Sequence, residues 1–285
     1  MRPRCQCTLR RPVSIDGVGY WSGREVRVEL LPAPAGSGVV FVRGDRDVPV
    51  RIGAAIDNRV EAVQRTVLAV AGVQVQMVEH VMSALAGLGV DCCQVRVSAE
   101  ELPGLDGSAQ AFVDLIDAAG LEQLGAPVEP LVVEEAFRVG DGDSWVEVSQ
   151  PRRPGLSVEY ELDYGPGPIG RQVLTLEVTP DAYRTDLAAA RTFISAGEAE
   201  RLRAAGLGLA STHRDLLVFG ADGPIGNSLR WPDECVRHKV LDLVGDLALV
   251  GRPLHAHVRA RRSGHRLNGA AAARLVAASR RRASA

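Results

Sequence analysis

The sequence predicts an α+β fold with two similar layered halves, each a β-sheet packed against helices. The first observation is a series of short apolar and polar runs from residue 12 to about residue 72, broken by glycine and proline, which is typical of strands and turns. The second is a change to helical periodicity after residue 77, and the third is a return of strand patterns near residue 131. Strands first and helices later, in both halves, favour separate sheet and helix layers over alternating βαβ units.

In the first half, strands are predicted at REVRVELLPA (24–33) and GVVFVRG (38–44), which are rich in valine and bounded by glycine or proline. Helices are predicted at VEHVMSALAGLGV (78–90) and SAQAFVDLIDAAG (108–120), the latter with Ser108 as its N-cap. We expect both helices to cover the apolar face of the sheet.

The second half repeats this order after residue 130. Strands are predicted at LVVEEAFRV (131–139), SWVEV (144–148), LSVEYELDY (156–164) and RQVLTLEV (171–178). Helical segments follow, among them residues 233–250 and the tail from residue 265. We therefore expect an N-terminal domain at residues 1–125 and a C-terminal domain at residues 126–285.

Composition excludes several classes of function. The formal net charge is −2, with acidic and basic residues interspersed, so we expect no nucleic-acid partner. No apolar run is long enough to span a bilayer, and we expect no transmembrane segment. The five cysteines form no C-x-x-C pair, which indicates free thiols and a cytoplasmic location. We also expect a monomer.

Lys239 is the only lysine in a chain whose other 32 basic residues are arginines. Arginine is a broad planar fork, whereas lysine is a compact charge on a flexible stem. A site that needs a narrow cation would resist the exchange for arginine, so the position of Lys239 indicates function. The alternative is that this lysine is an accident of composition.

The helix predicted at 233–250 carries a polar stripe next to Lys239. His238, Asp242 and Asp246 follow one another at intervals of four residues, which places them on one face between apolar neighbours. An imidazole and a carboxylate one turn apart can bind the same metal ion. The alternative is a solvent-facing helix edge with an ordinary His–Asp contact.

Glu79 and His80 begin the helix that follows the strand-like run VQVQ (73–76). Their side chains would emerge at the end of a sheet, where binding sites are common, and His80 is the best candidate for a third metal ligand. A carboxylate beside a metal-bound histidine can accept a proton from the bound water. Alone, this dipeptide is more often found on a protein surface.

Five motifs, which include the residues above, resemble those of a known protein family. They are MVEHVMSALAGLGVD (77–91), ELPGLDGSAQAF (101–112), ARTF (190–193), HKxxDxxGD (238–246) and SGHxLN (263–268). Their sequence and order resemble the UDP-3-O-acyl-N-acetylglucosamine deacetylases, and the likeness begins at GVGYWSG (17–23), so that it covers nearly the whole chain. The resemblance implies two similar α+β domains, each with a small insert, and an active site between them.

The resemblance also implies the activity: a zinc-dependent amidase that removes acetate from UDP-3-O-acyl-N-acetylglucosamine in an early committed step of lipid A biosynthesis. Carried over from the matching motifs, the zinc ligands are His80, His238 and Asp242. Iron(II) accepts the same set of ligands. Glu79 corresponds to the general base, and His265 to the general acid that Asp246 orients.

Further residues correspond to substrate contacts. Thr192 would hold the carbonyl oxygen, and Lys239 would contact the substrate and stabilise the charge that develops on this oxygen. The remaining expected contacts of the acylated UDP-amino sugar are Phe193, Arg262 and Gly264. Arg261 is a second candidate, with Arg262, for the diphosphate.

The sequence departs from the family pattern at three places. Tyr20-Trp21-Ser22-Gly23 replaces the usual Leu-His-Thr-Gly, and Met77 replaces a threonine. The segment ISAGEAERLRAAGLGLAS (194–211), expected to form the insert helix beside the acyl chain, is small and polar, so acyl length is left open. Two alternatives therefore stay open: a deacetylase of a different acylated or nucleotide-linked amino sugar, or a non-catalytic metal-binding homologue.

Overall fold

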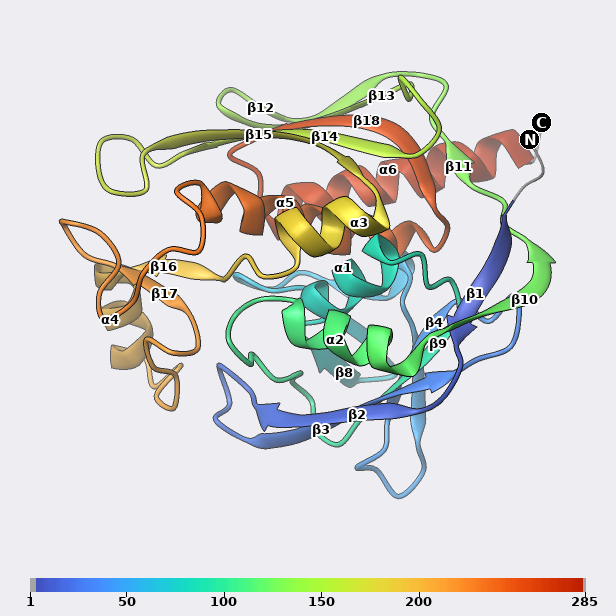
Figure 1. The fold of residues 1–285 in the computed structure, drawn as a ribbon, viewed down its shortest axis with the longest axis horizontal. Helices are drawn as coiled ribbons and strands as arrows, with labels where there is room; N and C mark the ends of the chain where they lie inside the picture. The colour runs from blue at the N-terminus through green and yellow to red at the C-terminus, as the bar shows by residue number, and fades with distance from the viewer. Residues whose placement is uncertain (1–3, 284–285) are drawn as a thin grey trace.

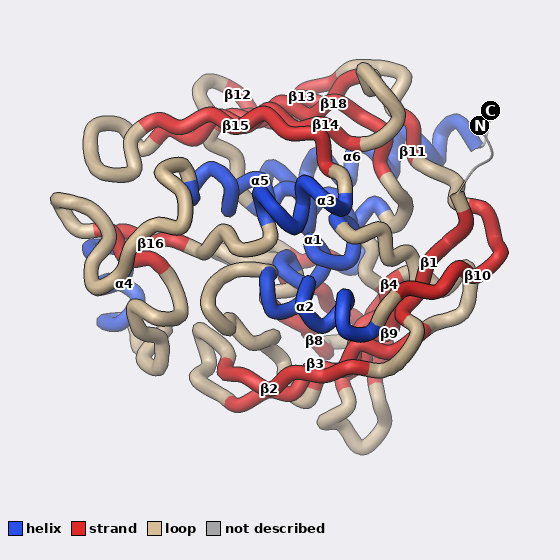
Figure 2. Tube along the Cα trace, in the orientation of Figure 1, coloured by secondary structure: helices blue, strands red, loops and turns tan. Residues whose placement is uncertain are grey.

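The computed structural model describes residues 4–283 and confirms the predicted α+β class. Two β-sheets form the outer layers, and helices lie between them (Figure 1). Figure 2 shows the same arrangement by type of structure, with strands on both sides of the central helices. The buried apolar side chains of both sheets and of the helices form one continuous core.

The first sheet has five strands in the order β2-β3-β9-β4-β5. They are β2 (Val13–Val18), β3 (Glu25–Pro32), β4 (Val39–Arg43), β5 (Val50–Gly53) and β9 (Cys93–Val97). Along β3, Val26, Val28 and Leu30 are buried because alternate side chains of a strand face the helices. Strand β9 lies between two hairpins, antiparallel to β3 and parallel to β4.

The second sheet has the order β12-β13-β18-β14-β15, and a short strand, β11, pairs with β18. The strands are β11 (Leu131–Val132), β12 (Phe137–Asp141), β13 (Ser144–Ser149), β14 (Leu156–Asp163), β15 (Arg171–Val178) and β18 (Leu254–Arg261). Strand β18 again lies between two hairpins, antiparallel to β13 and parallel to β14. The two sheets therefore share one topology.

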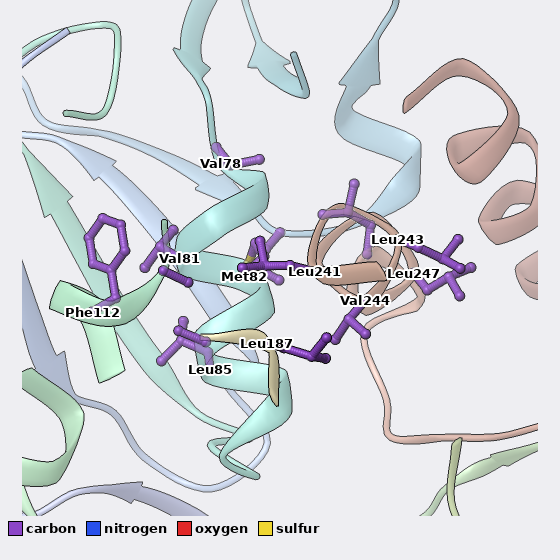
Figure 3. Packing of buried hydrophobic residues seen from close by; sticks show 14 of the residues in the cluster. Val78, Val81, Met82, Leu85, Phe112, Leu187, Leu241, Leu243, Val244 and Leu247 are labelled. Carbon is purple, nitrogen blue, oxygen red and sulfur yellow. The ribbon is translucent and has the colours of Figure 1, made fainter. Parts of the chain in front are cut away.

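The helices of the middle layer are α1 (Glu79–Gly87), α2 (Gln110–Ala119), α5 (Glu234–Leu247) and α6 (His265–Ala283). Helix α2 packs on the first sheet, α5 and α6 pack on the second, and α1 packs against α5. Figure 3 shows Met82 of α1 beside Leu241 of α5, with Leu243 and Leu247 on the far side of α5. The two helices approach closely at Gly245, where an added Cβ would lie 2.1 Å from the backbone oxygen of Glu79.

Each half carries an insert between its second hairpin and its first long helix. The first insert is a three-stranded sheet of β6 (Arg59–Val60), β7 (Val67–Val70) and β8 (Val73–Gln76). The second consists of β16 (Phe193–Ser195), α4 (Ala196–Ala204) and β17 (Leu217–Phe219), and projects to the left in Figure 1. Short helical turns complete the chain: η1 (Ile56–Asn58), α3 (Pro180–Ala182), the π-helix η2 (Tyr183–Leu187) and η3 (Ala248–Val250).

Two local expectations were wrong. The run 131–139 is not one strand, because the chain changes partner within it: β11 pairs with β18, whereas β12 pairs with β13. The N-cap of α2 is Ala109, one residue later than predicted, and the Ser108 hydroxyl accepts a hydrogen bond from the Gln110 backbone N–H at 3.2 Å.

The division into domains at residues 1–125 and 126–285 stays a prediction. The proposed boundary falls within β10 (Leu121–Pro127), which pairs antiparallel with β1 (Cys5–Leu9). Across residues 4–283, none of the helices has the length and apolar character that crossing a membrane requires.

Candidate active site

The site lies where the first turn of α1 meets the middle of α5. Met77, in a left-handed backbone conformation (φ 59°), turns the chain from β8 into α1, so that Glu79 and His80 are its first two residues. Helix α5 carries His238, Asp242 and Asp246 on the face that packs against α1. All five of these side chains are buried.

His80, His238 and Asp242 offer ligand atoms that all lie within 4.8 Å of one another. Asp242 Oδ1 lies 3.4 Å from His238 Nε2 and 3.7 Å from His80 Nε2. This buried oxygen has no hydrogen-bond partner among the described residues, which is unfavourable unless a cation binds there. The three residues that the sequence singled out as ligands thus fit a divalent metal.

The tautomer of His238 also suits metal binding. Its Nδ1 lies 3.0 Å from the backbone oxygen of Ala190, which can only accept a hydrogen bond. Nδ1 therefore carries the proton, and Nε2 keeps a lone pair that can bind a metal. Burial lowers the pKa of His238, and burial together with His238 lowers the pKa of His80 to about 3. Both imidazoles are therefore neutral, the form that binds a metal.

Lys239 donates a hydrogen bond to Asp242 Oδ2 at 2.7 Å, which leaves Oδ1 as the oxygen of this carboxylate that is available to a metal ion. Burial opposes both charges, but His238 and Lys239 hold the pKa of Asp242 far below its usual range. In turn, Asp242 and Tyr160 keep the pKa of Lys239 above its usual range despite burial. The lone lysine is thus a charged group in contact with Asp242, one of the three candidate metal ligands.

Glu79 and His265 face each other beside the three candidate metal ligands. Glu79 Oε1 lies 3.9 Å from His265 Nε2, and His265 Nδ1 lies 2.9 Å from Asp246 Oδ2. Burial raises the pKa of Glu79 to about 7, near the value that suits a general base at neutral pH. Burial lowers the pKa of His265, but Asp246, Glu79 and Asp242 together raise it to about 9.

A cleft of about 1160 Å³ opens above this cluster and is lined by both halves and both inserts. The expected site residues that line it are Glu79, His80, Thr192, Phe193, His238, Lys239, Asp242, Arg262, Gly264 and His265. Asp246 is fully buried behind His265. The geometry therefore brings together all ten expected residues at the cleft, with the eleventh directly behind them.

The expected substrate contacts differ in their surroundings. The Thr192 hydroxyl donates to the Gly107 backbone oxygen at 3.0 Å and lies 3.2 Å from His238 Nε2. The Phe193 ring packs edge-on against Tyr164 and Phe219. A Cβ at Gly264 would meet only open space, which leaves room for a ligand at this wall of the cleft.

Of the two arginines expected near the diphosphate, only one lines the cleft. Arg262 lines the cleft, and its left-handed backbone (φ 47°) turns the chain away from β18. Arg261 stays on the sheet, where it forms ion pairs with Asp143, Glu161 and Asp163 at 3.3–3.8 Å.

Two polar residues near the site were missed by the sequence reasoning. Asn268 donates to Asp246 Oδ2 at 2.8 Å, and its place in the SGHxLN motif was an available signal. Thr66 contacts Glu79 and Asp246, but nothing in its local sequence indicates a partner 180 residues away.

Fold and site together define a metal-dependent amidohydrolase: a buried His-His-Asp cluster lies in one cleft with a carboxylate and a histidine–aspartate pair. The chain belongs to the UDP-3-O-acyl N-acetylglycosamine deacetylase family, whose model matches residues 6–277.

Relatives carry the name UDP-3-O-acyl-N-acetylglucosamine deacetylase. The protein of Solibacter usitatus is 38% identical over 274 residues, which are 96% of this chain and 92% of the relative. That of Anaeromyxobacter sp. (strain Fw109-5) is 39% identical over 275 residues, 95% of this chain and 88% of the relative. That of Myxococcus xanthus is 38% identical over 271 residues, 94% of this chain and 86% of the relative.

Proposed function

We propose that this protein removes the acetyl group from UDP-3-O-acyl-N-acetylglucosamine, an early committed step of lipid A biosynthesis. The observation that carries the proposal is the gathering of the His-His-Asp cluster, Glu79 and His265 in one cleft of a chain that belongs to this family. In this proposal the acid His265 lies beside both the base and the metal ligands, since its Nε2 is 3.9 Å from Glu79 Oε1 and 4.0 Å from Asp242 Oδ2.

Zinc is the proposed metal. Two imidazoles and one carboxylate, with a further position open to water or substrate, are typical of catalytic zinc sites, and iron(II) is the alternative. Bound at His80, His238 and Asp242, such an ion would act as a Lewis acid and lower the pKa of a water ligand to about 7.

The proposed residue roles follow from the positions of their polar atoms. Glu79 accepts a proton from the water that attacks the amide carbon, because it lines the cleft beside the three candidate ligands. Lys239 and Thr192 stabilise the negative charge that develops on the carbonyl oxygen. When the carbon–nitrogen bond breaks, His265 donates a proton to the nitrogen, so that acetate and the free amine leave. Asp246 keeps His265 oriented through its Nδ1.

A first prediction concerns the lone lysine: Lys239→Arg should fold and bind metal, yet lose about tenfold in kcat/KM. The ammonium of Lys239 reaches Asp242 Oδ2 at 2.7 Å, and a wider guanidinium would crowd this ligand or the substrate. Steady-state kinetics with metal analysis checks this, with Lys239→Ala as the comparison that removes the charge. Full activity of the arginine variant would show that any cation suffices.

A second prediction tests the substrate. The metal-loaded protein should release acetate from the 3-O-acylated nucleotide sugar at least about tenfold faster than from UDP-N-acetylglucosamine, because remote binding energy positions the amide. Mass spectrometry on a panel of UDP-amino sugars, with zinc or iron(II) as the metal, measures the rates of acetate release from the two compounds. Equal rates would favour a deacetylase of another nucleotide-linked amino sugar. No acetate from any compound, despite bound metal, would favour a non-catalytic homologue.

We also propose a monomer in the cytoplasm. Every residue of the proposed mechanism comes from one chain, and all five cysteines are unpaired, which suits a reducing compartment.

A further inference from the structure

Thr66 occupies a position that none of the roles above includes. It is fully buried, directly before β7, in the insert of the first half. Its backbone N–H donates to Glu79 Oε2 at 3.0 Å, and its hydroxyl donates to Asp246 Oδ1 and lies 3.3 Å from His265 Nδ1. One residue therefore contacts the proposed base, the proposed acid and the carboxylate that orients the acid.

The contacts of Asp246 indicate the role of the Thr66 hydroxyl. Its Oδ2 accepts hydrogen bonds from His265 Nδ1 at 2.9 Å and from Asn268 Nδ2 at 2.8 Å. Its Oδ1 has the Thr66 hydroxyl as its partner among the described contacts. The hydroxyl thus fixes the rotation of the carboxylate, and through it the plane of the His265 ring.

The backbone contact acts on Glu79 in the same way. Because Oε2 accepts from Thr66, Oε1 is the oxygen that faces His265 Nε2, at 3.9 Å. Thr66 thereby sets the spacing between two proton-transferring groups that come from different halves of the chain, on α1 and α6.

We infer that Thr66 is a positioning residue that holds Glu79 and the His265–Asp246 pair in their working geometry, so that the first insert takes part in catalysis. This inference rests on the proposed function, because it assumes that Glu79 and His265 transfer protons. Loss of a hydrogen-bond partner behind a metal ligand typically lowers activity by about 10-fold to 100-fold, and we expect a similar loss for the partner of a proton-transferring group.

The test compares two variants that separate the hydroxyl from the shape of the side chain. Thr66→Val keeps the volume and the backbone N–H to Glu79 but removes the hydroxyl, whereas Thr66→Ser keeps the hydroxyl. We expect Thr66→Val to lower kcat by about 10-fold to 100-fold with little change in KM or metal content, and Thr66→Ser to retain activity within about threefold. In an Asp246→Ala background, Thr66→Val should cause little further loss of kcat, because both substitutions remove the same hydrogen bond between Thr66 and Asp246.

A second readout needs no substrate. In protein labelled with ¹⁵N-histidine, the His265 Nδ1 proton signal should shift or broaden in Thr66→Val and stay in place in Thr66→Ser. This signal tests the positioning role even if the proposed substrate is not turned over. An unchanged His265 signal and unchanged kcat in Thr66→Val would overturn the inference, as would equal losses in the valine and serine variants.

Discussion

Replacing Glu79 with glutamine should lower kcat by about 10²-fold to 10⁴-fold while the metal stays bound. Glutamine has the same shape and still accepts the hydrogen bond from the Thr66 backbone, but it cannot take a proton from water. His80 and the two proposed ligands on α5 are unchanged, so the variant should keep the metal but lose the reaction. Glu79 is also buried next to the proposed acid His265.

Metal analysis and single-turnover rates on the same preparation check this result. The control is Glu147→Gln, which makes the same exchange on the second sheet, where Glu147 pairs with Arg138 at 2.9 Å. The control should keep its activity. Near-normal turnover in Glu79→Gln would mean that another group activates the water, and loss of metal would mean that Glu79 is itself a ligand.

Gly245→Ala should lower the free energy of unfolding by about 3 kcal/mol and weaken metal binding, although alanine normally favours a helix over glycine by about 1 kcal/mol. An alanine Cβ would lie 2.1 Å from Glu79 O and 2.9 Å from Glu79 C, which are backbone atoms that cannot move aside cheaply. The methyl group would push α1 and α5 apart. His80 would then move away from Asp242, now 3.7 Å distant.

Urea unfolding and metal titration measure the two effects. Gly197→Ala is the matched control, because Gly197 is an exposed residue of α4 whose added Cβ would meet only the end of the Arg201 side chain at 3.9 Å. This control should be neutral or slightly stabilising. An unfolding midpoint of Gly245→Ala at or above that of the unchanged protein, with metal retained, would contradict the close-approach argument.

The elements that the sequence predicted best are those with strong helical periodicity. The 3.6-residue repeat placed His238, Asp242 and Asp246 on one face of α5, and the structure has them there. Family motifs then added His265 and Thr192, which no local pattern identifies. Periodicity does not predict which distant strands pair, because the same alternating run fits an edge strand and a central strand equally well.

Two features of the site depend on such distant contacts. The hydroxyl of Thr66 meets Asp246 only because the first insert folds onto α5. The ion pairs of Arg261 with acidic residues follow from the register of β18 with its neighbours. By contrast, the contact of Lys239 with Asp242 is an i,i+3 pair on one helix, and the sequence contained enough information to predict it.

The central place of β18 has a consequence for how the chain acquires its structure during synthesis. The hairpins β12–β13 and β14–β15 are local and can form as soon as they leave the ribosome, but the strand that joins them ends at Arg261 and pairs with residues about 100 positions earlier, such as Ser157 with His257. Pairing over such separations is slow, and N-terminal units generally fold first. The first sheet, whose central strand ends at Val97, is complete long before the second. The candidate active site needs α1 from the early part of the chain and α5 and α6 from the late part, so it cannot be complete until the late part has been made.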